Sequence, residues 1–152
     1  MSEEKTNRAL VLGIGNSSRQ DDALGWRFLD FLQTAGVTGF DLEYRYQLQV
    51  EDAELISGYE KVFFVDATTE VTEKGFYLRP CETKSPDDLT SHSLSPESVN
   101  FLCRSIFGKK PECKIIGIGG IQFELGKELT SQAERNLCNA QDFFIEHLFT
   151  YI

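Results

Sequence analysis

Long hydrophobic runs are absent from this sequence. None of its apolar stretches approaches the roughly 20 residues that a helix needs to cross a bilayer. Residues 1–6 are polar and acidic, which does not fit the basic and then apolar order of an export signal. From both absences we expect a cytoplasmic protein that has no membrane among its partners.

Basic residues are also few. The chain has 15 Lys and Arg against 24 Asp and Glu, so its formal net charge is −9 at pH 7. Surfaces that bind nucleic acids or anionic membranes need clustered Lys and Arg to neutralise phosphate groups. The charge therefore excludes nucleic acid from the expected partners and favours a cation or another protein.

Signatures of familiar metal and hydrolase sites are missing. The four cysteines are scattered and form no C-x-x-C pair, so neither a zinc knuckle nor a thioredoxin-like redox site is indicated. The chain contains no H-E-x-x-H and no G-x-S-x-G motif. Of its two histidines, His147 lies among apolar residues of a predicted helix, where a packing or surface role is expected. No catalytic nucleophile can be named from the sequence.

Apolar runs and helical patterns alternate along the chain. With 152 residues, 41% of them hydrophobic, we expect a single domain over 1–152 with 1–7 as a flexible tail. The run at 61–68 is too continuously apolar for burial on one face only, which is typical of a parallel sheet covered on both sides. The sequence therefore predicts a doubly wound α/β sheet of about five strands. Strands are expected at 8–14, 41–48, 61–68, 75–79 (at an edge or antiparallel) and 113–120, and helices at 21–35, 50–57, 95–107 and 130–149.

A glycine turn follows the first predicted strand and leads into a pair of acids. The segment Gly13-Ile14-Gly15-Asn16 is similar to the start of a dinucleotide-binding turn, but the pattern G-x-G-x-x-G needs a glycine where this chain has Ser18. Asp21 and Asp22 lie at the start of the following helix, where a diphosphate would bind and where two carboxylates would repel it. A nucleotide or flavin site is therefore the weaker alternative.

Three polar side chains are predicted to meet at one edge of the sheet. Asp22 and Asp66 lie at the carboxyl ends of two strands, close to the point where the strand order of such sheets reverses. His92 lies in a loop before a predicted helix and could reach the same edge. One imidazole and two carboxylates suit a first-row divalent ion and leave coordination positions open. The alternatives are that Asp21 or Asp22 only caps the first helix and that Asp66 only ends a strand.

Several short motifs, taken in order, are shared with one protein family. They are Gly13-x-Gly15-Asn16 with Asp21-Asp22 and Gly25, then Val65-Asp66-Ala67, Ser91-His92, Gly117-Ile118 and the segment FELGKELTSQAERNL. With them the chain resembles the hydrogenase maturation endopeptidases, which trim the C-terminal tail of the nickel-iron hydrogenase large subunit. The resemblance extends from Ala9 to about Leu148, so it concerns most of the chain.

This resemblance implies a three-layer α/β/α sandwich with hydrolase activity. The implied enzyme is a metal-dependent endopeptidase that removes the C-terminal extension of a nickel-iron hydrogenase large-subunit precursor after nickel insertion. Apart from the resemblance, we expect it to be a monomer. Metal-ligand and catalytic roles fall on Asp22, Asp66 and His92, with Asp21 supporting a ligand or capping the helix. The nickel would be carried by the precursor, and zinc or cadmium could occupy the same ligands. Such a metal could polarise the scissile carbonyl or activate water, or a carboxylate could act as general base.

Two alternatives of different kinds stay open. A non-catalytic module of the same fold could bind or chaperone a metalloprotein, and a nucleotide or flavin binder could use the glycine turn. The sequence also departs from the family pattern in two places. Many members have a glycine-rich loop where this chain has residues 44–49, YRYQLQ. How this loop would contact the precursor therefore does not follow from the family pattern. Ala23 replaces a frequent glycine, a change that favours the helix.

Overall fold

The computed structural model describes residues 9–87 and 94–148, so the expected tail at 1–7 lies outside the described residues. Five strands form one sheet in the order β2-β1-β3-β5-β4: β1 (Ala9–Ile14), β2 (Phe40–Arg45), β3 (Lys61–Thr68), β4 (Phe76–Pro80) and β5 (Glu112–Gly119). Neighbouring strands run parallel, except that β4 pairs antiparallel with β5 at the edge of the sheet. The expected mostly parallel sheet with an antiparallel edge strand is confirmed.

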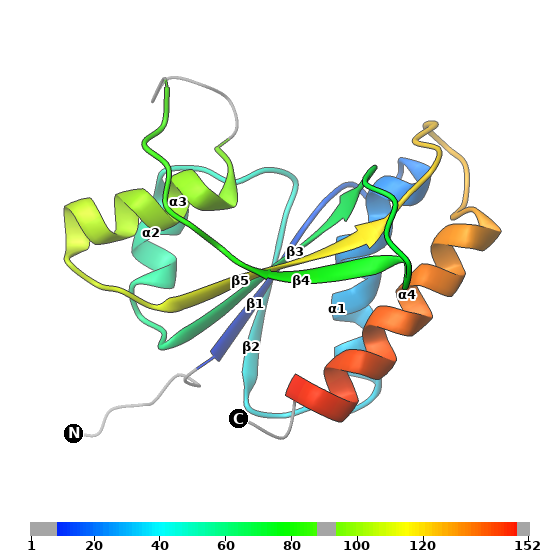
Figure 1. Ribbon diagram of the computed structural model, residues 1–152, viewed down its shortest axis with the longest axis horizontal. Helices are drawn as coiled ribbons and strands as arrows, with labels where there is room; N and C mark the ends of the chain where they lie inside the picture. Colours follow the sequence, from blue (N-terminus) through cyan, green and yellow to red (C-terminus); the bar gives the residue numbers. More distant parts are fainter. Residues whose placement is uncertain (1–8, 88–93, 149–152) are drawn as a thin grey trace.

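Helices cover both faces of this sheet (Figure 1). The helices and short turns are η1 (Gln20–Ala23), α1 (Leu24–Thr34), α2 (Glu51–Ile56), α3 (Pro96–Leu102), η2 (Cys103–Phe107), α4 (Ser131–Phe143) and η3 (Phe144–Leu148). α1 and α4 lie on one face, and α2 and α3 lie on the other. The expected three-layer α/β/α sandwich is therefore confirmed. None of the helices in the described residues is long and apolar enough to cross a bilayer.

Two hydrophobic cores fill the spaces between the layers. Because successive residues of a strand point to opposite faces, β1 and β3 supply side chains to both cores. Val11 and Val65 pack under α1 and α4, whereas Leu12 and Phe64 pack under α2 and α3. All four side chains are fully buried. Burial on both faces explains why these two strands are continuous apolar runs in the sequence.

Two predicted boundaries are wrong. The second strand ends at Arg45 rather than at residue 48, because the chain leaves the sheet there and Leu48 makes a single bridge to Leu94 instead. The first α-helix begins at Leu24 rather than at residue 21, because the acid pair lies in the separate 3₁₀ turn η1. The acids therefore precede the helix instead of forming its first turn.

The glycine turn allows η1 and the start of α1 to lie directly against the strand ends. A Cβ atom added at Gly15 would lie 2.2 Å from the carbonyl oxygen of Asp22. One added at Gly25 would lie 2.5 Å from the carbonyl oxygen of Ile14 and 2.6 Å from that of Val65. Only glycine leaves room for such backbone contacts. The glycines therefore serve close packing of the acid-bearing turn on β1 and β3.

We expect Gly25→Ala to lower the free energy of unfolding by about 1–3 kcal/mol, because the added methyl group meets backbone oxygens that cannot yield by changing a rotamer. The matched control is Gly58→Ala, whose Cβ would have its nearest neighbour, the Leu55 carbonyl oxygen, at 3.7 Å. Urea unfolding measures both variants. Equal midpoints for the two would contradict the packing role of Gly25.

Candidate active site

The strand order reverses between β1 and β3, which lie side by side. Asp22 follows β1 in η1, and Asp66 lies near the end of β3. Asp66 shares its face of the sheet with Val62 and Phe64, the face that α2 and α3 cover. In doubly wound sheets the crevice at this position is where ligands bind. The structure thus brings the two predicted carboxylates together, close enough for the charge of Asp22 to raise the pKa of Asp66.

The Asp66 carboxyl can gain or lose a proton near neutral pH. Burial raises its pKa to about 7, and the charge of Asp22 adds to this shift. The Ala67 N–H opposes the shift by donating a hydrogen bond to Oδ1 at 2.8 Å. A carboxyl group with such a pKa is suited to general acid or base chemistry, and it becomes a cation ligand when it is ionised.

Asp22 keeps its carboxylate free while its backbone is fixed. Burial raises the pKa of this group, and the charge of Arg19 partly counteracts the effect. The Asp22 carbonyl accepts a hydrogen bond from the Asn16 N–H at 3.0 Å. Within residues 9–87 and 94–148, no group donates a hydrogen bond to the Asp22 carboxylate. This side chain is therefore available to a ligand.

Asp21 has a different role from its neighbour. It is 0% exposed, and its carboxylate accepts hydrogen bonds of 2.8 to 3.2 Å from the loop between β5 and α4. The donors are the N–H groups of Ile121, Gln122 and Thr130 and the hydroxyl of Thr130. Burial raises the pKa of Asp21, but these hydrogen bonds lower it more strongly, so the net shift is downward. Neither acid caps the first helix, so that alternative is wrong.

The third predicted ligand, His92, lies outside the described residues. Leu94, two residues later, is buried in the core under α2 and α3 and bridges to Leu48 beyond the end of β2. Among the described residues, no group of three Asp, Glu, His or Cys side chains is arranged to hold a metal ion. Ligation by the complete set therefore stays a prediction. His147 is exposed beside the ring of Phe143, as expected for a surface residue.

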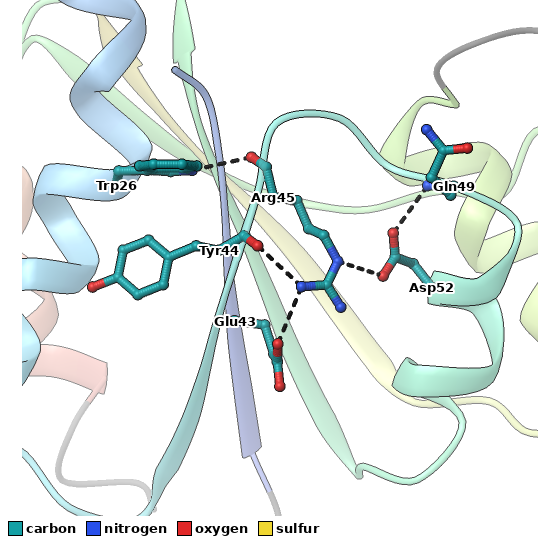
Figure 2. Close-up of polar contacts among 6 residues, drawn as sticks. All are labelled: Trp26, Glu43, Tyr44, Arg45, Gln49 and Asp52. Atoms are coloured by element: carbon teal, nitrogen blue, oxygen red, sulfur yellow. Dashed lines mark hydrogen bonds and ion pairs between the residues drawn. The ribbon is translucent and has the colours of Figure 1, made fainter. Parts of the chain in front are cut away.

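Sequence reasoning missed a polar network at the end of β2 (Figure 2). The Arg45 side chain donates to Asp52 at 3.0 Å and to Glu43 at 3.1 Å. The Asp52 carboxylate also accepts from the Gln49 N–H at 2.9 Å, and the Arg45 carbonyl accepts from the Trp26 indole at 3.0 Å. This network joins β2, α1 and α2 around the loop that departs from the family pattern. Hydrogen bonds rather than glycines therefore define the shape of that loop.

The cysteines offer no nucleophile to this site. Cys81, Cys103 and Cys113 are buried in the core under α2 and α3, and burial raises the pKa of each thiol. A thiol with a raised pKa is a poor nucleophile because little of it is ionised. Cys138 is exposed on α4, which covers the opposite face of the sheet from Asp66.

No family model and no curated protein matches the sequence. Several solved structures, in contrast, match the fold. The NiFe hydrogenase maturation protease HycI from Thermococcus kodakarensis KOD1 is 21% identical, with 92% of this chain and 91% of that one covered and a TM-score of 0.69. The hydrogenase 2 maturation peptidase from a Thaumarchaeota archaeon is 24% identical, with 93% and 97% covered and a TM-score of 0.67. The hydrogenase maturating endopeptidase HybD from Escherichia coli is 17% identical, with 95% and 93% covered and a TM-score of 0.68.

This chain has the fold of the hydrogenase maturation proteases. The fold that the sequence resemblance implied is thereby confirmed. Because one fold supports many activities, the chemistry has to be argued from the site itself. In this maturation-protease fold, Asp22 and Asp66 offer oxygen ligands to a divalent cation, and Asp66 can also carry a proton. Backbone atoms of the protein fill the space beside Gly15 and Gly25, so these glycines serve close packing of the turn.

We expect the Asp66 carboxyl carbon to titrate with a midpoint near 7 in the metal-free protein, measured by carbon-13 NMR. Asp22→Asn should lower that midpoint, because it removes a neighbouring negative charge. A midpoint near the ordinary value of 3.8 would contradict the burial described above.

The same pKa predicts how stability depends on pH. Since the folded pKa of Asp66 is raised, ionised Asp66 destabilises the fold, and this cost grows as pH rises from about 4 to 7. Asp66→Asn should therefore be more stable than the wild type at pH 8, by about 1–4 kcal/mol, and not at pH 4. Urea unfolding at both pH values measures the difference, with Asp142→Asn, at an exposed position on α4, as the control.

The two adjacent acids should respond oppositely to substitution. Asp21→Asn should lower the free energy of unfolding at pH 7 by about 2–4 kcal/mol, because the amide cannot replace a carboxylate that accepts four hydrogen bonds. Asp22→Asn should cost nothing or stabilise slightly. Because the folded pKa of Asp21 is lowered, its contribution is present above about pH 4 and is lost as pH falls through the folded pKa. Similar losses for both variants in urea unfolding would argue against these separate roles.

Proposed function

We propose that this protein is an endopeptidase that removes the C-terminal extension of a nickel-iron hydrogenase large-subunit precursor after nickel insertion. The observation that carries the proposal is the pairing of Asp22 with Asp66 at the switch point of its sheet. The fold is shared over more than nine-tenths of both chains with solved hydrogenase maturation proteases. We further propose that the protein acts as a monomer in the cytoplasm.

The nickel of the precursor would be recognised by Asp22, Asp66 and His92. Two carboxylates and an imidazole leave coordination positions for the ligands that the precursor itself contributes. The order of Ser91-His92 after Val65-Asp66-Ala67, which resembles the family pattern, supports the inclusion of His92. Zinc or cadmium could occupy the same ligands when the precursor is absent.

Asp66 would couple nickel recognition to proton release. A carboxyl group with a pKa of about 7 keeps its proton about half of the time at neutral pH, and it must lose that proton to bind a cation. When the precursor departs, burial favours the return of the proton. The exchange is therefore readily reversible near neutral pH.

Metal dependence would also explain the missing nucleophile. The three cysteines beneath α2 and α3 have raised pKa values and are unsuited to attack on a peptide bond. Hydrolysis would then use a water molecule, whose pKa a bound metal lowers. A precursor without nickel would lack this activation, so cutting would follow only completed nickel insertion.

A cleavage assay with nickel-loaded precursor tests the site. We expect the wild type to release the C-terminal peptide. Each loss of a proposed ligand should slow cleavage by at least about 100-fold, in the variants Asp22→Asn, Asp66→Asn and His92→Gln. Mass spectrometry of both products measures the rates. His147→Gln, on the exposed surface of η3, is the matched control and should cleave at the wild-type rate. Equal cleavage by all variants would remove the proposed site.

Nickel-free precursor separates recognition from hydrolysis. The wild type should leave it intact, and cleavage at the rate of the loaded precursor would contradict recognition of nickel while leaving the protease assignment in place. Stable binding of loaded precursor by the wild type without release of the peptide would instead favour the non-catalytic module of the same fold.

A further inference from the structure

A tyrosine lies in the same row of the sheet as Asp66. Asp66 of β3 pairs with Gly117 of β5, and Gly117 pairs in turn with Tyr77 of β4. Residues that pair across strands share one face of the sheet. Only a residue without a side chain therefore stands between Tyr77 and Asp66.

The Tyr77 ring occupies the space that a side chain at Gly117 would need. A Cβ atom added at Gly117 would lie 2.3 Å from Cζ of Tyr77 and 2.7 Å from its hydroxyl oxygen. The hydroxyl end of the ring therefore lies over β5, having crossed from β4 in the direction of β3. Because Cβ positions of paired residues are about 5 Å apart, the hydroxyl oxygen lies within about 8 Å of the Asp66 Cβ.

Two residues hold this ring in place. The Arg79 guanidinium stacks on it, 3.8 Å from the ring centroid. Both carboxylate oxygens of Glu70 accept hydrogen bonds from the same guanidinium. A side chain fixed in this way loses little conformational freedom when its hydroxyl binds a ligand.

The row contains donors and acceptors of different kinds. Asp22 and Asp66 are acceptors when ionised, so they attract a cation or the N–H groups of a substrate. The Arg79 guanidinium is already engaged by Glu70. The Tyr77 hydroxyl is a further donor in this row, and no hydrogen bond joins it to any other residue within 9–87 and 94–148.

We propose that Tyr77 is a substrate-binding residue whose hydroxyl donates a hydrogen bond to a main-chain carbonyl of the precursor tail beside Asp66. This inference rests on the proposed function, because it assigns the substrate to the same site. A hydrogen bond to the main chain positions the extended tail whatever its side chains are. The group bound between Tyr77 and Asp66 is thus a peptide unit.

Tyr77→Phe tests this role because it removes the hydroxyl and keeps the ring that packs on Gly117. With nickel-loaded precursor we expect kcat/KM to fall about 5- to 10-fold, the value of one hydrogen bond, while the urea midpoint stays unchanged. The matched control is Tyr59→Phe. Tyr59 lies just before β3, and its hydroxyl donates a hydrogen bond to Asp41 at 2.6 Å. That variant should lose stability and keep its kcat/KM. Equal kcat/KM for wild type and Tyr77→Phe overturns the proposal.

Gly117→Ala provides a second measurement, because its methyl group must displace the ring. It should lower kcat/KM at least as much as Tyr77→Phe, and the double variant should lose no more than Gly117→Ala alone. Full additivity of the two effects would count against the proposal.

Failure of the proposed function would be seen separately, as a wild type that does not cleave loaded precursor. In that case the Kd of the precursor decides the role of Tyr77. A Kd that Tyr77→Phe raises about 5- to 10-fold supports the role of Tyr77. A Kd that is the same for wild type and variant overturns it, and so does a wild type that does not bind the precursor.

Discussion

The contact between the first turn of α1 and the ends of the two central strands positions the groups that the site uses. At Gly25 the helix backbone meets the carbonyl oxygens of Ile14 and Val65 at distances that any side chain would prevent. Asp22 lies three residues before Gly25, and Asp66 directly follows Val65. One backbone contact therefore determines how far apart the two carboxylates lie. The glycines of this turn allow the helix to pack closely on the strand ends. They therefore have a structural role that does not require a bound phosphate.

The two adjacent acids have different surroundings. Successive residues of a 3₁₀ turn point about 120° apart, so one aspartate can face inward while the next faces the crevice. Asp21 is fully paired with the loop after β5, and hydrogen bonds hold its pKa down. No described residue donates a hydrogen bond to the Asp22 carboxylate, and burial raises its pKa. The inward acid thus holds the turn in place, whereas the outward acid leaves its oxygens without a donor from the described part of the chain.

Burial of Asp22 and Asp66 disfavours two negative charges at this position. Asp22 and Asp66 repel one another there, and a proton or a cation relieves the repulsion. Two further arrangements are fixed within the same fold. The Arg45 network orders the loop after β2, and the Tyr77 ring, stacked by Arg79, covers Gly117.

The sequence alone determined the class of fold and the two acids of the site. Continuous apolar runs such as 61–68 indicate burial on both faces, and a polar residue at the end of such a run falls at the carboxyl edge, as Asp66 does. His92 is predicted beside them from its place in the loop before a helix and from the family resemblance, and this prediction lies outside the described residues. The fold class is confirmed and the two acids lie together, because both inferences rest on local patterns and on rules that hold for a whole architecture.

Only the tertiary structure decided what each acid does. Asp21 and Asp22 are chemically identical in the sequence, and the donors that separate them, such as the Thr130 N–H, lie 109 residues away along the chain. Likewise, Tyr77 comes beside Asp66 only because β4 adds antiparallel to β5, opposite a glycine. Pairings of this kind depend on strand order and register. Local periodicity does not give the strand order, because it reports only which face of an element is buried.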